Sequence, residues 1–372
     1  METLSIFDCL PEEEAEKYKP KKSTDWKWTM AEDYPTEKNG LKVFSCFACG
    51  GGSTMGYKLA GCDVVGSCEI DPRMNGVYLA NHKPKHNFLM DIRKFNEMPN
   101  DELPDELFNL DILDGSPPCT TFSMSGDRED SWGKKKKFRE GQAEQTLDDL
   151  PFVFIETVEK LKPKCVIMEN VKGLILGEAW RYVQEIYSHF ASAGYSVRHW
   201  LLKGEQMGVP QKRHRVFFVA VRKDVPFDLQ RLDMTFNYEP ILYREIKSGT
   251  HQKLNIEKAK IAALSTYGET SLCETMLRLK GRETYFSEKI IYENTVCNTI
   301  TAGGCEIWIG NTGCHINDEE TISASTFPID YDFCKQKVKY ICGMSVPPVM
   351  IKRIVTRLID SGVFDYKNTH TK

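Results

Sequence analysis

The sequence predicts an α/β protein built on a doubly wound, mostly parallel sheet, with a small mixed second domain. Between residues 41 and 222, short apolar runs alternate with segments of helical periodicity. Strands that alternate with helices in this way form parallel sheets, and ligands bind at the carboxyl ends of the strands. After Arg222 the alternation stops. We therefore expect four parts: an N-terminal extension (1–40), a large domain with the ligand sites (41–223), a smaller domain (224–297) and a C-terminal segment (298–372) that returns to the large domain.

Each element is predicted by a local pattern. An apolar strand at 41–47 leads into a glycine-rich turn at 49–53, where consecutive glycines allow a close approach of the backbone. Asp71 with Pro72 predicts the start of one helix, and Pro347 with Pro348 predicts the start of another. The remaining strands are expected at 63–69, 88–92, 110–113, 165–168, 196–202 and 216–222, and the helices at 54–60, 72–81, 149–161, 178–193 and 349–359.

Composition limits the classes of function. The chain has 372 residues, a formal net charge of −4 and a pI near 6.1. This charge gives no general attraction to nucleic acid, so any nucleic-acid surface must be local. The 13 cysteines lack the spacing of a disulfide framework, which indicates a reducing compartment. Met1–Leu10 has no basic segment or apolar core, and no run approaches about 18 apolar residues, so we expect a cytoplasmic protein without a membrane segment.

Three successive strand ends predict a site for a nucleoside. The turn Cys49–Ser53 follows the first strand, Glu69 ends the second and Asp91 ends the third. Glu69 can accept hydrogen bonds from two ribose hydroxyls, and Asp91 can accept one from an adenine amino group. The turn lacks the Lys-Ser/Thr of a phosphate-binding loop and the GxGxxG of a dinucleotide site. A nucleoside without a polyphosphate fits best, with S-adenosylmethionine as the obvious candidate; solvated strand-end acids are the alternative.

A cysteine that follows two prolines is the candidate nucleophile. The run Ser116-Pro117-Pro118-Cys119-Thr120 comes after the strand at 110–113, and proline fixes the backbone φ angle, so the Cys119 thiol should have one orientation. Glu169 follows a neighbouring strand. A thiol and a carboxylic acid at adjacent strand ends suit attack on an electron-poor ring together with protonation of that ring. An inert buried thiol is the alternative.

Two groups of positive charge should lie near this thiol. Arg213 and Arg215 precede the strand at 216–222, and alternate residues there point to one side. A nearby arginine favours the thiolate, which is the nucleophilic form of cysteine. Lys134–Lys137 lies in the segment after Cys119, where it could contact phosphate and close over a substrate. For both groups a solvated charged face is the alternative.

The ordered motifs resemble the C5 cytosine-specific DNA methyltransferase family over most of residues 41–360. They are Phe47–Gly52, Glu69, Asp91, Ser116-Pro117-Pro118-Cys119, Glu169-Asn170-Val171, Gln211-x-Arg213-x-Arg215, Asn298-Thr299-Ile300-Thr301-Ala302-Gly303-Gly304, Phe327-Pro328-x-Asp330-Tyr331 and Gly343-x-Ser345-Val346-Pro347. The resemblance implies a seven-stranded S-adenosylmethionine-dependent methyltransferase sheet, a target-recognition domain at 224–297 and a flipped-out substrate base. Two residues depart from the family pattern, because Cys49 replaces a glycine and Met344 replaces an asparagine.

The resemblance also implies roles for individual residues. Cys119 would attack C6 of a cytosine, Glu169 would hydrogen-bond or protonate N3, and Arg215 would contact O2. Asn170 would orient the proline turn through its backbone groups. The implied catalytic residues are Cys119, Glu169, Asn170, Arg213, Arg215 and Pro118. The implied cofactor-binding residues are Phe47, Ala48, Cys49, Gly50, Gly51, Gly52, Glu69, Ile70, Asp91, Ile92, Ser116, Pro118, Ser345 and Val346. No metal site is expected.

The implied partner is double-stranded DNA, and a monomer is expected. A cognate restriction endonuclease that acts independently is a candidate partner. The DNA-binding candidates are Ser123, Lys134, Lys135, Lys136, Lys137, Gln211, Arg244, Arg278 and Arg282. Two alternatives stay open. One is a tRNA cytosine-5 methyltransferase, although the Cys-Phe-Thr of those family members is absent from 224–297. The other is a non-catalytic DNA-binding regulator, which Cys49 and Met344 would favour if they block the cofactor.

Overall fold

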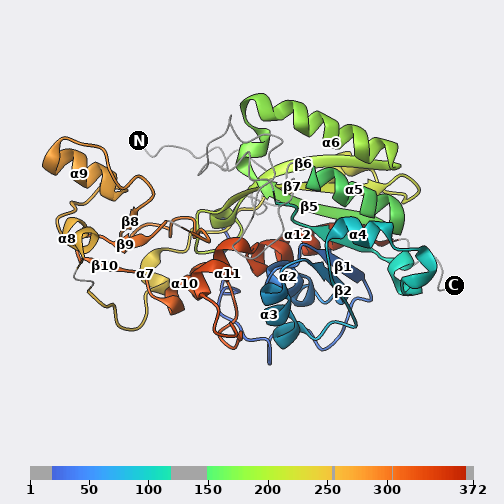
Figure 1. Cartoon of the computed structure of the whole chain (residues 1–372), viewed down its shortest axis with the longest axis horizontal. Coiled ribbons are helices and arrows are strands. Elements are labelled where there is room, and N and C mark those ends of the chain that lie inside the picture. Colours follow the sequence, from blue (N-terminus) through green and yellow to red (C-terminus); the bar gives the residue numbers. More distant parts are fainter. Residues whose placement is uncertain (1–18, 119–148, 254–255, 304, 366–372) are drawn as a thin grey trace.

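The computed structural model describes residues 19–118, 149–253, 256–303 and 305–365, and it is organised around a seven-stranded sheet (Figure 1). The strand order is β3-β2-β1-β4-β5-β7-β6. Neighbours from β3 to β5 pair in parallel, whereas β7 runs antiparallel to both β5 and β6. The prediction of a doubly wound, mostly parallel sheet is confirmed. The strands are β1 (Lys42–Cys46), β2 (Asp63–Glu69), β3 (His86–Leu89), β4 (Ile112–Gly115), β5 (Cys165–Val171), β6 (Tyr195–Lys203) and β7 (His214–Arg222).

Helices cover both faces of this sheet. Successive side chains of a strand point to opposite faces. Phe44 and Leu113 therefore join the core beneath α4, α5 and α6, whereas Val43 and Ile112 join the core beneath α2 and α12. The apolar strands are buried on both sides, as parallel strands require. The helices are α2 (Gly52–Leu59), α3 (Pro72–His82), α4 (Ile92–Glu97), α5 (Leu150–Leu161), α6 (Trp180–Ser192) and α12 (Pro348–Asp360).

The C-terminal helix α12 returns to the large domain, as predicted. Val349, Ile351 and Ile354 are fully buried in the core that α12 shares with the sheet. A Cβ placed on Gly56 of α2 would lie 2.5 Å from Ile351 Cβ, so the two helices approach too closely for any larger residue. None of the helices in the described part of the chain combines the length and apolar character that a membrane crossing requires.

Strand β5 is longer than the sequence predicts. It continues to Val171 rather than ending at Met168. The reason is its pairing with β7, in which Glu169 lies opposite Phe217 and Val171 lies opposite Arg215. The antiparallel pairing thus keeps the polar end of β5 in the sheet. It also fixes the positions of the Glu169 and Arg215 side chains.

The third strand ends earlier than the sequence predicts. Strand β3 stops at Leu89, and Asp91 begins helix α4 instead of closing the strand. Asp91 Oδ1 accepts a hydrogen bond from the backbone N–H of Arg93 at 2.9 Å, which is the usual contact of an N-cap residue. The sequence pattern predicts a strand at 88–92. In the structure the second half of this segment instead forms the start of helix α4.

A second, three-stranded sheet lies at the other end of the molecule, with α7, α10 and α11 between the two sheets (Figure 1). β8 pairs in parallel with β9, and β9 pairs antiparallel with β10, so this sheet is mixed. The boundary expected at residue 297 falls between β8 and β9. The elements are β8 (Lys289–Ile291), β9 (Ile307–Ile309), β10 (Cys314–His315), α7 (Tyr243–Ile246), α8 (Glu257–Ala263), α9 (Leu272–Lys280), α10 (Asp318–Ala324) and α11 (Val338–Met344).

Residues 19–40 of the N-terminal extension are anchored to the C-terminal segment. Trp26 and Trp28 are buried in a core that also contains Phe327. The Trp28 indole N–H donates to the carbonyl of Thr326 at 2.9 Å. The carboxylate of Asp330 accepts hydrogen bonds from the backbone N–H groups of residues 30 and 31, at 2.8 and 3.1 Å. A loosely docked extension is the simpler interpretation of the sequence, but these contacts correct it for residues 19–40.

Candidate active site

The proline turn at residues 116–118 leaves the sheet at the carboxyl end of β4, beside the end of β5. Asn170 holds this turn: its side-chain N–H donates to the carbonyl of Pro117 at 3.2 Å, and its Oδ1 accepts from the Val171 N–H at 2.8 Å. The Asn170 side chain is buried. The amide therefore fixes the path of the chain immediately before Cys119, which lies outside the described residues.

A buried ion pair joins β5 to β7 next to this turn. Glu169 Oε1 lies 2.9 Å from Arg215 Nε, and both side chains are largely buried. Arg215 also donates from Nη1 to the carbonyl of His214 at 2.9 Å. Burial lowers the pKa of Arg215, and the carboxylate of Glu169 opposes this effect. An acid and a cation fixed at neighbouring strand ends can polarise or protonate a ring that binds beside them.

Arg213 contacts the C-terminal segment rather than a ligand surface. Its guanidinium is 2% exposed and donates to the carbonyls of Ile300 at 3.1 Å and Gly343 at 3.0 Å. Burial lowers the pKa of Arg213 to about 9, and the neighbouring charge of Arg215 acts in the same direction. Arg213 thus ties the start of β7 to the segment before β9 and to α11, and so it supports the position of Arg215.

The glycine-rich turn after β1 folds over the carboxylate of Glu69. Glu69 Oε2 accepts from the backbone N–H of Cys49 at 2.7 Å, and Oε1 accepts from that of Asp71 at 2.8 Å. Burial raises the pKa of Glu69. Each carboxylate oxygen has two lone pairs, so each can accept one further hydrogen bond. This donor and acceptor chemistry fits the two ribose hydroxyls of the predicted nucleoside.

The glycines of this turn touch the C-terminal segment. A Cβ on Gly52 would lie 2.4 Å from the carbonyl oxygen of Val346 and 2.7 Å from Ser345 Cβ. A Cβ on Gly50 would lie 2.7 Å from the hydroxyl of Tyr331, which donates a hydrogen bond to the Gly50 carbonyl. The predicted cofactor residues before α2 and after α11 are therefore brought together, although they lie far apart in the sequence.

The cofactor residues after β2 and β3 lie side by side. The Met90 N–H donates to the carbonyl of Glu69 at 3.0 Å, which places Asp91 beside the Glu69–Ile70 strand end. The Asp91 carboxylate is partly occupied, because it caps α4 and lies 3.5 Å from Arg93 Nη1. Ile92 is buried in the core of the large domain. Both of these contacts involve Asp91 Oδ1. Oδ2 therefore lies outside the cap and is the candidate acceptor for the predicted contact with an adenine amino group.

Cys49, which replaces the family's glycine, has an unfavourable backbone conformation. Its φ angle is 46°, in the left-handed region that glycine adopts freely. A residue with a Cβ costs roughly 1–2 kcal/mol more there. Burial raises the pKa of the Cys49 thiol to about 12, with the charge of Glu69 as the second cause. The thiol therefore stays neutral and is no candidate nucleophile.

We expect the Cys49→Gly substitution to be tolerated. Glycine removes roughly 1 kcal/mol of backbone strain, and the lost burial of a small side chain is worth a similar amount. The free energy of unfolding, measured in urea, should change by less than about 1 kcal/mol. Cys49→Val is the matched control, since a branched side chain at this φ angle should destabilise more. A larger loss of stability in Cys49→Gly than in Cys49→Val would contradict this account of Cys49.

The predicted DNA-binding residues of the large domain divide into two groups. Ser123 and Lys134–Lys137 lie outside the described residues. Gln211 is fully buried, and its amide donates to the carbonyl of Ala324 at 3.1 Å and accepts from the Ile300 N–H at 3.1 Å. This burial corrects the expectation that Gln211 contacts DNA, because the side chain instead joins β7 to the C-terminal segment.

The three arginines predicted from the smaller domain are exposed. Arg244 donates to the Asn294 side chain at 2.6 Å, and Arg278 forms an ion pair with Glu269 at 2.6 Å. Arg282 lies in the turn that follows α9. Exposed ion pairs are weak and exchange readily with other anions. All three side chains therefore remain candidates for contacts with DNA.

Sequence reasoning missed Asp114, which belongs to strand β4, whereas the strand predicted at 110–113 ends one residue before it. Asp114 is 2% exposed, and its carboxylate accepts hydrogen bonds from the hydroxyls of Ser45 at 2.7 Å and Tyr57 at 3.0 Å. Strand pairing places Ser45 directly opposite Asp114. An acidic residue directly after the apolar run 110–113 was the signal that could have revealed a buried polar group.

A second missed residue, His82, supports the glycine-rich turn from α3. His82 Nε2 lies 3.2 Å from the Gly50 carbonyl oxygen, and a Cβ on Gly51 would collide with the imidazole. Burial lowers the pKa of His82 to about 3, with the charge of Lys58 as the second cause. The imidazole is therefore neutral at ordinary pH and donates to Gly50. No sequence pattern distinguishes such a histidine from others at the end of a helix.

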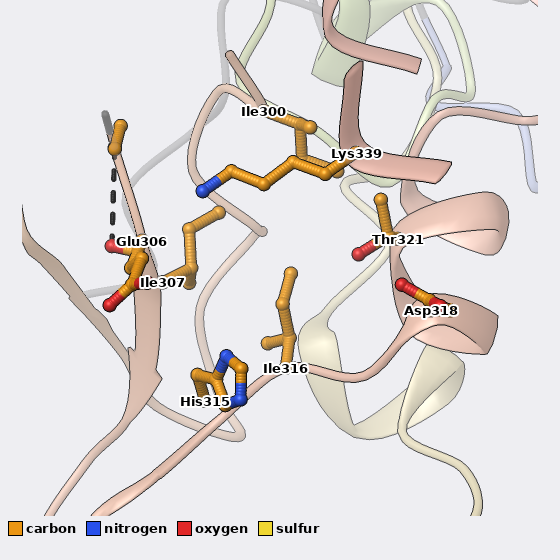
Figure 2. A pocket seen from close by; sticks show the side chains of 9 residues that line it. Ile300, Glu306, Ile307, His315, Ile316, Asp318, Thr321 and Lys339 are labelled. Carbon is orange, nitrogen blue, oxygen red and sulfur yellow. Dashed lines mark hydrogen bonds between the residues drawn. The ribbon is translucent and has the colours of Figure 1, made fainter. Parts of the chain in front are cut away.

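A separate cavity of about 140 Å³ lies between the small sheet and helices α10 and α11. Figure 2 shows Lys339 reaching across it toward the strand of Glu306, with His315 on the opposite wall. Ile300 lines the cavity, and its carbonyl accepts from Arg213. Among the residues that the structure describes, none of the predicted catalytic or cofactor residues lines this cavity, so it is distinct from the site at the strand ends.

The fold and the site define an α/β protein with a buried acid and an arginine at neighbouring strand ends. Residues 41–360 match the family described as C-5 cytosine-specific DNA methylase. The chain belongs to this family, and the match includes both the large domain and the small sheet.

Several known proteins are similar to this chain. The type II methyltransferase M.NgoPII of Neisseria gonorrhoeae is 30% identical over 200 residues, which cover 53% of this chain and 52% of that protein. The type II methyltransferase M.FnuDI of Fusobacterium nucleatum is 32% identical over 185 residues, which cover 50% and 48%. The chain thus spans about half the length of these curated relatives. The crystal structure of a Spodoptera frugiperda DNMT2 mutant has the same fold, with a TM-score of 0.62, 16% identity and coverage of 86% of this chain and 100% of that chain.

Proposed function

We propose that the protein is a DNA (cytosine-5-)-methyltransferase that uses S-adenosylmethionine and acts through a covalent bond from Cys119 to the base. The observation that carries this proposal is the buried pair of Glu169 and Arg215 beside the proline turn that leads to Cys119. A thiol, an acid and a fixed cation are the groups that addition to a pyrimidine ring requires. Family membership and the type II methyltransferase relatives support DNA as the substrate.

In the proposed reaction a cytosine turns out of the double helix, at a cost of a few kcal/mol for unstacking. The Cys119 thiolate forms a bond to C6 while Glu169 donates a proton to N3, so that little negative charge builds up on the ring. C5 becomes nucleophilic and would take the methyl group from the sulfonium of S-adenosylmethionine, which would leave as the thioether S-adenosylhomocysteine. Loss of the C5 proton to solvent restores the double bond and expels the Cys119 thiolate, and N3 returns its proton to Glu169.

The contact between Arg215 and Glu169 fixes both side chains beside the proposed base site, with Glu169 Oε1 2.9 Å from Arg215 Nε. Arg215 would donate to cytosine O2, and Glu169 would face N3. Arg213 contributes by fixing the backbone at the start of β7 through Ile300 and Gly343.

The residues around the glycine-rich turn would hold the cofactor. S-adenosylmethionine supplies an electrophilic methyl group when it is bound. Glu69 would accept from the ribose hydroxyls, and Asp91 would accept from the adenine amino group. The turn at Gly50–Gly52 would bring the backbone close to the ligand, and Ser345 and Val346 already lie against it. No described side chain of the turn offers a cation for a phosphate, which agrees with a nucleoside ligand.

The test is transfer of labelled methyl from S-adenosylmethionine to mixed-sequence DNA, with tRNA in parallel, followed by mapping of 5-methylcytosine. We expect label in DNA at one short sequence. Label in tRNA alone would overturn DNA as the substrate. Absence of transfer together with absence of S-adenosylmethionine binding would overturn the enzyme proposal and favour a DNA-binding regulator. Calorimetric titration of the cofactor separates that outcome from the use of an unsuitable DNA.

A further inference from the structure

Tyr331 lies in the C-terminal segment, yet its hydroxyl reaches the glycine-rich turn of the large domain. The residue is 5% exposed, and the hydroxyl donates a hydrogen bond to the carbonyl of Gly50. Burial raises the pKa of Tyr331 well above its ordinary value, so the hydroxyl stays protonated and can serve as this donor. His82 Nε2 lies 3.2 Å from the same carbonyl oxygen. A carbonyl oxygen has two lone pairs, so Gly50 can accept from both groups at once.

The backbone of the turn packs directly against Tyr331. A Cβ on Gly50 would lie 2.7 Å from the Tyr331 hydroxyl and 2.8 Å from Ile341 Cγ2. One residue earlier, the backbone N–H of Cys49 donates to Glu69 Oε2 at 2.7 Å. The Tyr331 hydroxyl therefore fixes the turn immediately beside the carboxylate that is the proposed acceptor for the ribose hydroxyls.

Tyr331 is itself held by its neighbours in the chain. Its ring makes edge-on contacts with the rings of Phe327 and Phe333, with centroids 5.0 and 4.8 Å apart. Such aromatic pairs are favourable and have a defined geometry. The backbone of Asp332 also exchanges two hydrogen bonds with the side chain of Asn81 on α3, at 2.8 and 2.9 Å. These contacts hold the Tyr331 ring in the position from which its hydroxyl reaches the turn.

The N-terminal segment (residues 26–34) packs against the same stretch of chain. The indole N–H of Trp28 donates to the carbonyl of Thr326 at 2.9 Å, and the Trp28 carbonyl accepts from the Ile329 N–H at 3.2 Å. The carboxylate of Asp330 accepts from two backbone N–H groups of the N-terminal segment, at 2.8 and 3.1 Å. These hydrogen bonds attach the N-terminal segment to the residues that directly precede the tyrosine.

We propose that the N-terminal segment, acting through Tyr331, holds the glycine-rich turn in the conformation that binds S-adenosylmethionine. This inference rests on the proposed function, because it concerns the cofactor site of that reaction. Tyr331 is a positioning residue, since it contacts the turn and acts on the cofactor only through it. Without these contacts the turn would adopt other conformations as well, and selection of the competent one would cost affinity. The N-terminal segment precedes residue 41, where the family match begins, so this role lies outside the family's shared motifs.

The first test is Tyr331→Phe, which removes the hydroxyl and keeps the ring. The dissociation constant for S-adenosylmethionine, measured by calorimetric titration, should rise about five- to tenfold, as expected for the loss of one buried hydrogen bond to the turn. The single-turnover rate at saturating cofactor and DNA should stay within about twofold of wild type, because the hydroxyl acts on binding alone. An unchanged dissociation constant would overturn the inference.

Tyr195 provides the matched control for this substitution. It is 1% exposed, and its hydroxyl also donates to a backbone carbonyl, that of Pro163, at 2.6 Å. Strand pairing places Tyr195 near Cys165 at the amino end of β5, whereas the cofactor site lies at the carboxyl ends of the strands. Tyr195→Phe should lower the urea midpoint about as much as Tyr331→Phe but leave the dissociation constant within about twofold of wild type. Equal losses of affinity would show a general effect of removing a buried hydroxyl and would overturn the inference.

Asp330→Asn tests the link to the N-terminal segment. An amide can accept from one of the two backbone N–H groups that Asp330 binds, but its own N–H opposes the other. The dissociation constant for S-adenosylmethionine should rise about threefold. In the double variant with Tyr331→Phe the two losses should not add, because the segment acts through the same hydroxyl. Additive losses would overturn the proposed route through Tyr331.

Asp228 provides the control for Asp330. It is also exposed, and its carboxylate accepts from the backbone N–H of Gln230 at 3.0 Å. Arg198 of β6 donates to the carbonyl of Leu229 at 3.0 Å, which places this turn beside an edge strand that three strands separate from β1. Asp228→Asn should leave the affinity for S-adenosylmethionine unchanged. A threefold loss in this variant as well would overturn the link to the N-terminal segment.

Amide hydrogen exchange separates this inference from the proposed function. Peptides that contain the turn at 49–53 should exchange faster in Tyr331→Phe and in Asp330→Asn than in wild type, whereas peptides of β6 should exchange alike. Absence of S-adenosylmethionine binding by wild type would overturn the proposed function, and exchange of the turn would then decide whether the N-terminal segment holds it. Equal exchange of the turn in wild type and both variants would overturn the inference alone. Faster exchange together with weaker cofactor binding in both variants would support both proposals.

Discussion

Replacing Cys119 with serine should abolish methyl transfer while S-adenosylmethionine and DNA still bind. A serine hydroxyl is far less acidic than a thiol, so little of the anionic nucleophile would form at residue 119. We expect the single-turnover rate to fall by at least about 10³-fold. Binding constants for both ligands should stay within about threefold of wild type, as measured by calorimetry and by fluorescence anisotropy with a labelled duplex.

The control for this substitution is Cys273→Ser. Cys273 is a partly buried cysteine of α9 that is far from the strand ends, so the same change of atom there should leave the rate nearly unaffected. DNA with 5-fluorocytosine at the target gives a direct test of the covalent bond, because fluorine cannot leave as the C5 proton does. Wild type should stay attached to this DNA on a denaturing gel. Methyl transfer by Cys119→Ser at a rate near wild type would refute the covalent scheme.

The second large effect is expected for Glu169→Gln, which should slow transfer about 10²- to 10³-fold. An amide can accept a hydrogen bond from Arg215 but cannot donate a carboxylic proton to N3. Loss of the carboxylate also leaves the buried Arg215 without its partner, so a moderate loss of stability should accompany the kinetic effect. The measurements are the single-turnover rate and the urea midpoint.

Glu205→Gln is the matched control for Glu169→Gln. Glu205 also contacts a basic side chain near the start of β7, since its Oε1 lies 2.7 Å from His214 Nε2. The side-chain hydrogen bond from His214 lowers the pKa of Glu205 against the effect of burial. Its substitution should change the transfer rate by no more than about twofold. Equal losses of rate in the two variants would show that a general disturbance of β7, and not the proton of Glu169, limits the reaction.

The order of elements in the large domain could be predicted because each strand and helix has a strong local pattern. The apolar runs 41–47 and 165–168 identify buried strands whatever their neighbours are, and the Asp71-Pro72 pair identifies a helix start. The residues at which strands and helices end depend on strand pairing and helix capping, which the local sequence pattern does not show. Pairing with β7 extends β5 to Val171, and the capping of α4 takes Asp91 out of the third strand.

The candidate site could be predicted only in part, for a similar reason. Polar residues at strand ends, such as Glu69 and Glu169, stand out because an apolar run precedes them. Whether such a residue faces a ligand or the protein interior depends on tertiary contacts. Gln211 belongs to a polar segment, which is typical of an exposed surface. Its side-chain amide is nevertheless buried and forms hydrogen bonds with the backbone of Ile300 and Ala324. Asp114 follows the strand predicted at 110–113, yet the parallel pairing of β1 and β4 places it inside the sheet, where it is buried.

The packing of α12 determines when this protein can fold during its synthesis. A growing chain that has reached Arg222 contains every strand of the large sheet, but the face that bears Val43 and Ile112 still lacks α12, one of the two helices that cover it. At ordinary elongation rates, roughly 7 to 28 seconds pass before α12 is complete. An apolar sheet face is exposed to aggregation throughout that interval. The large domain should therefore close only after α12 has been made, and it should depend on chaperones until then.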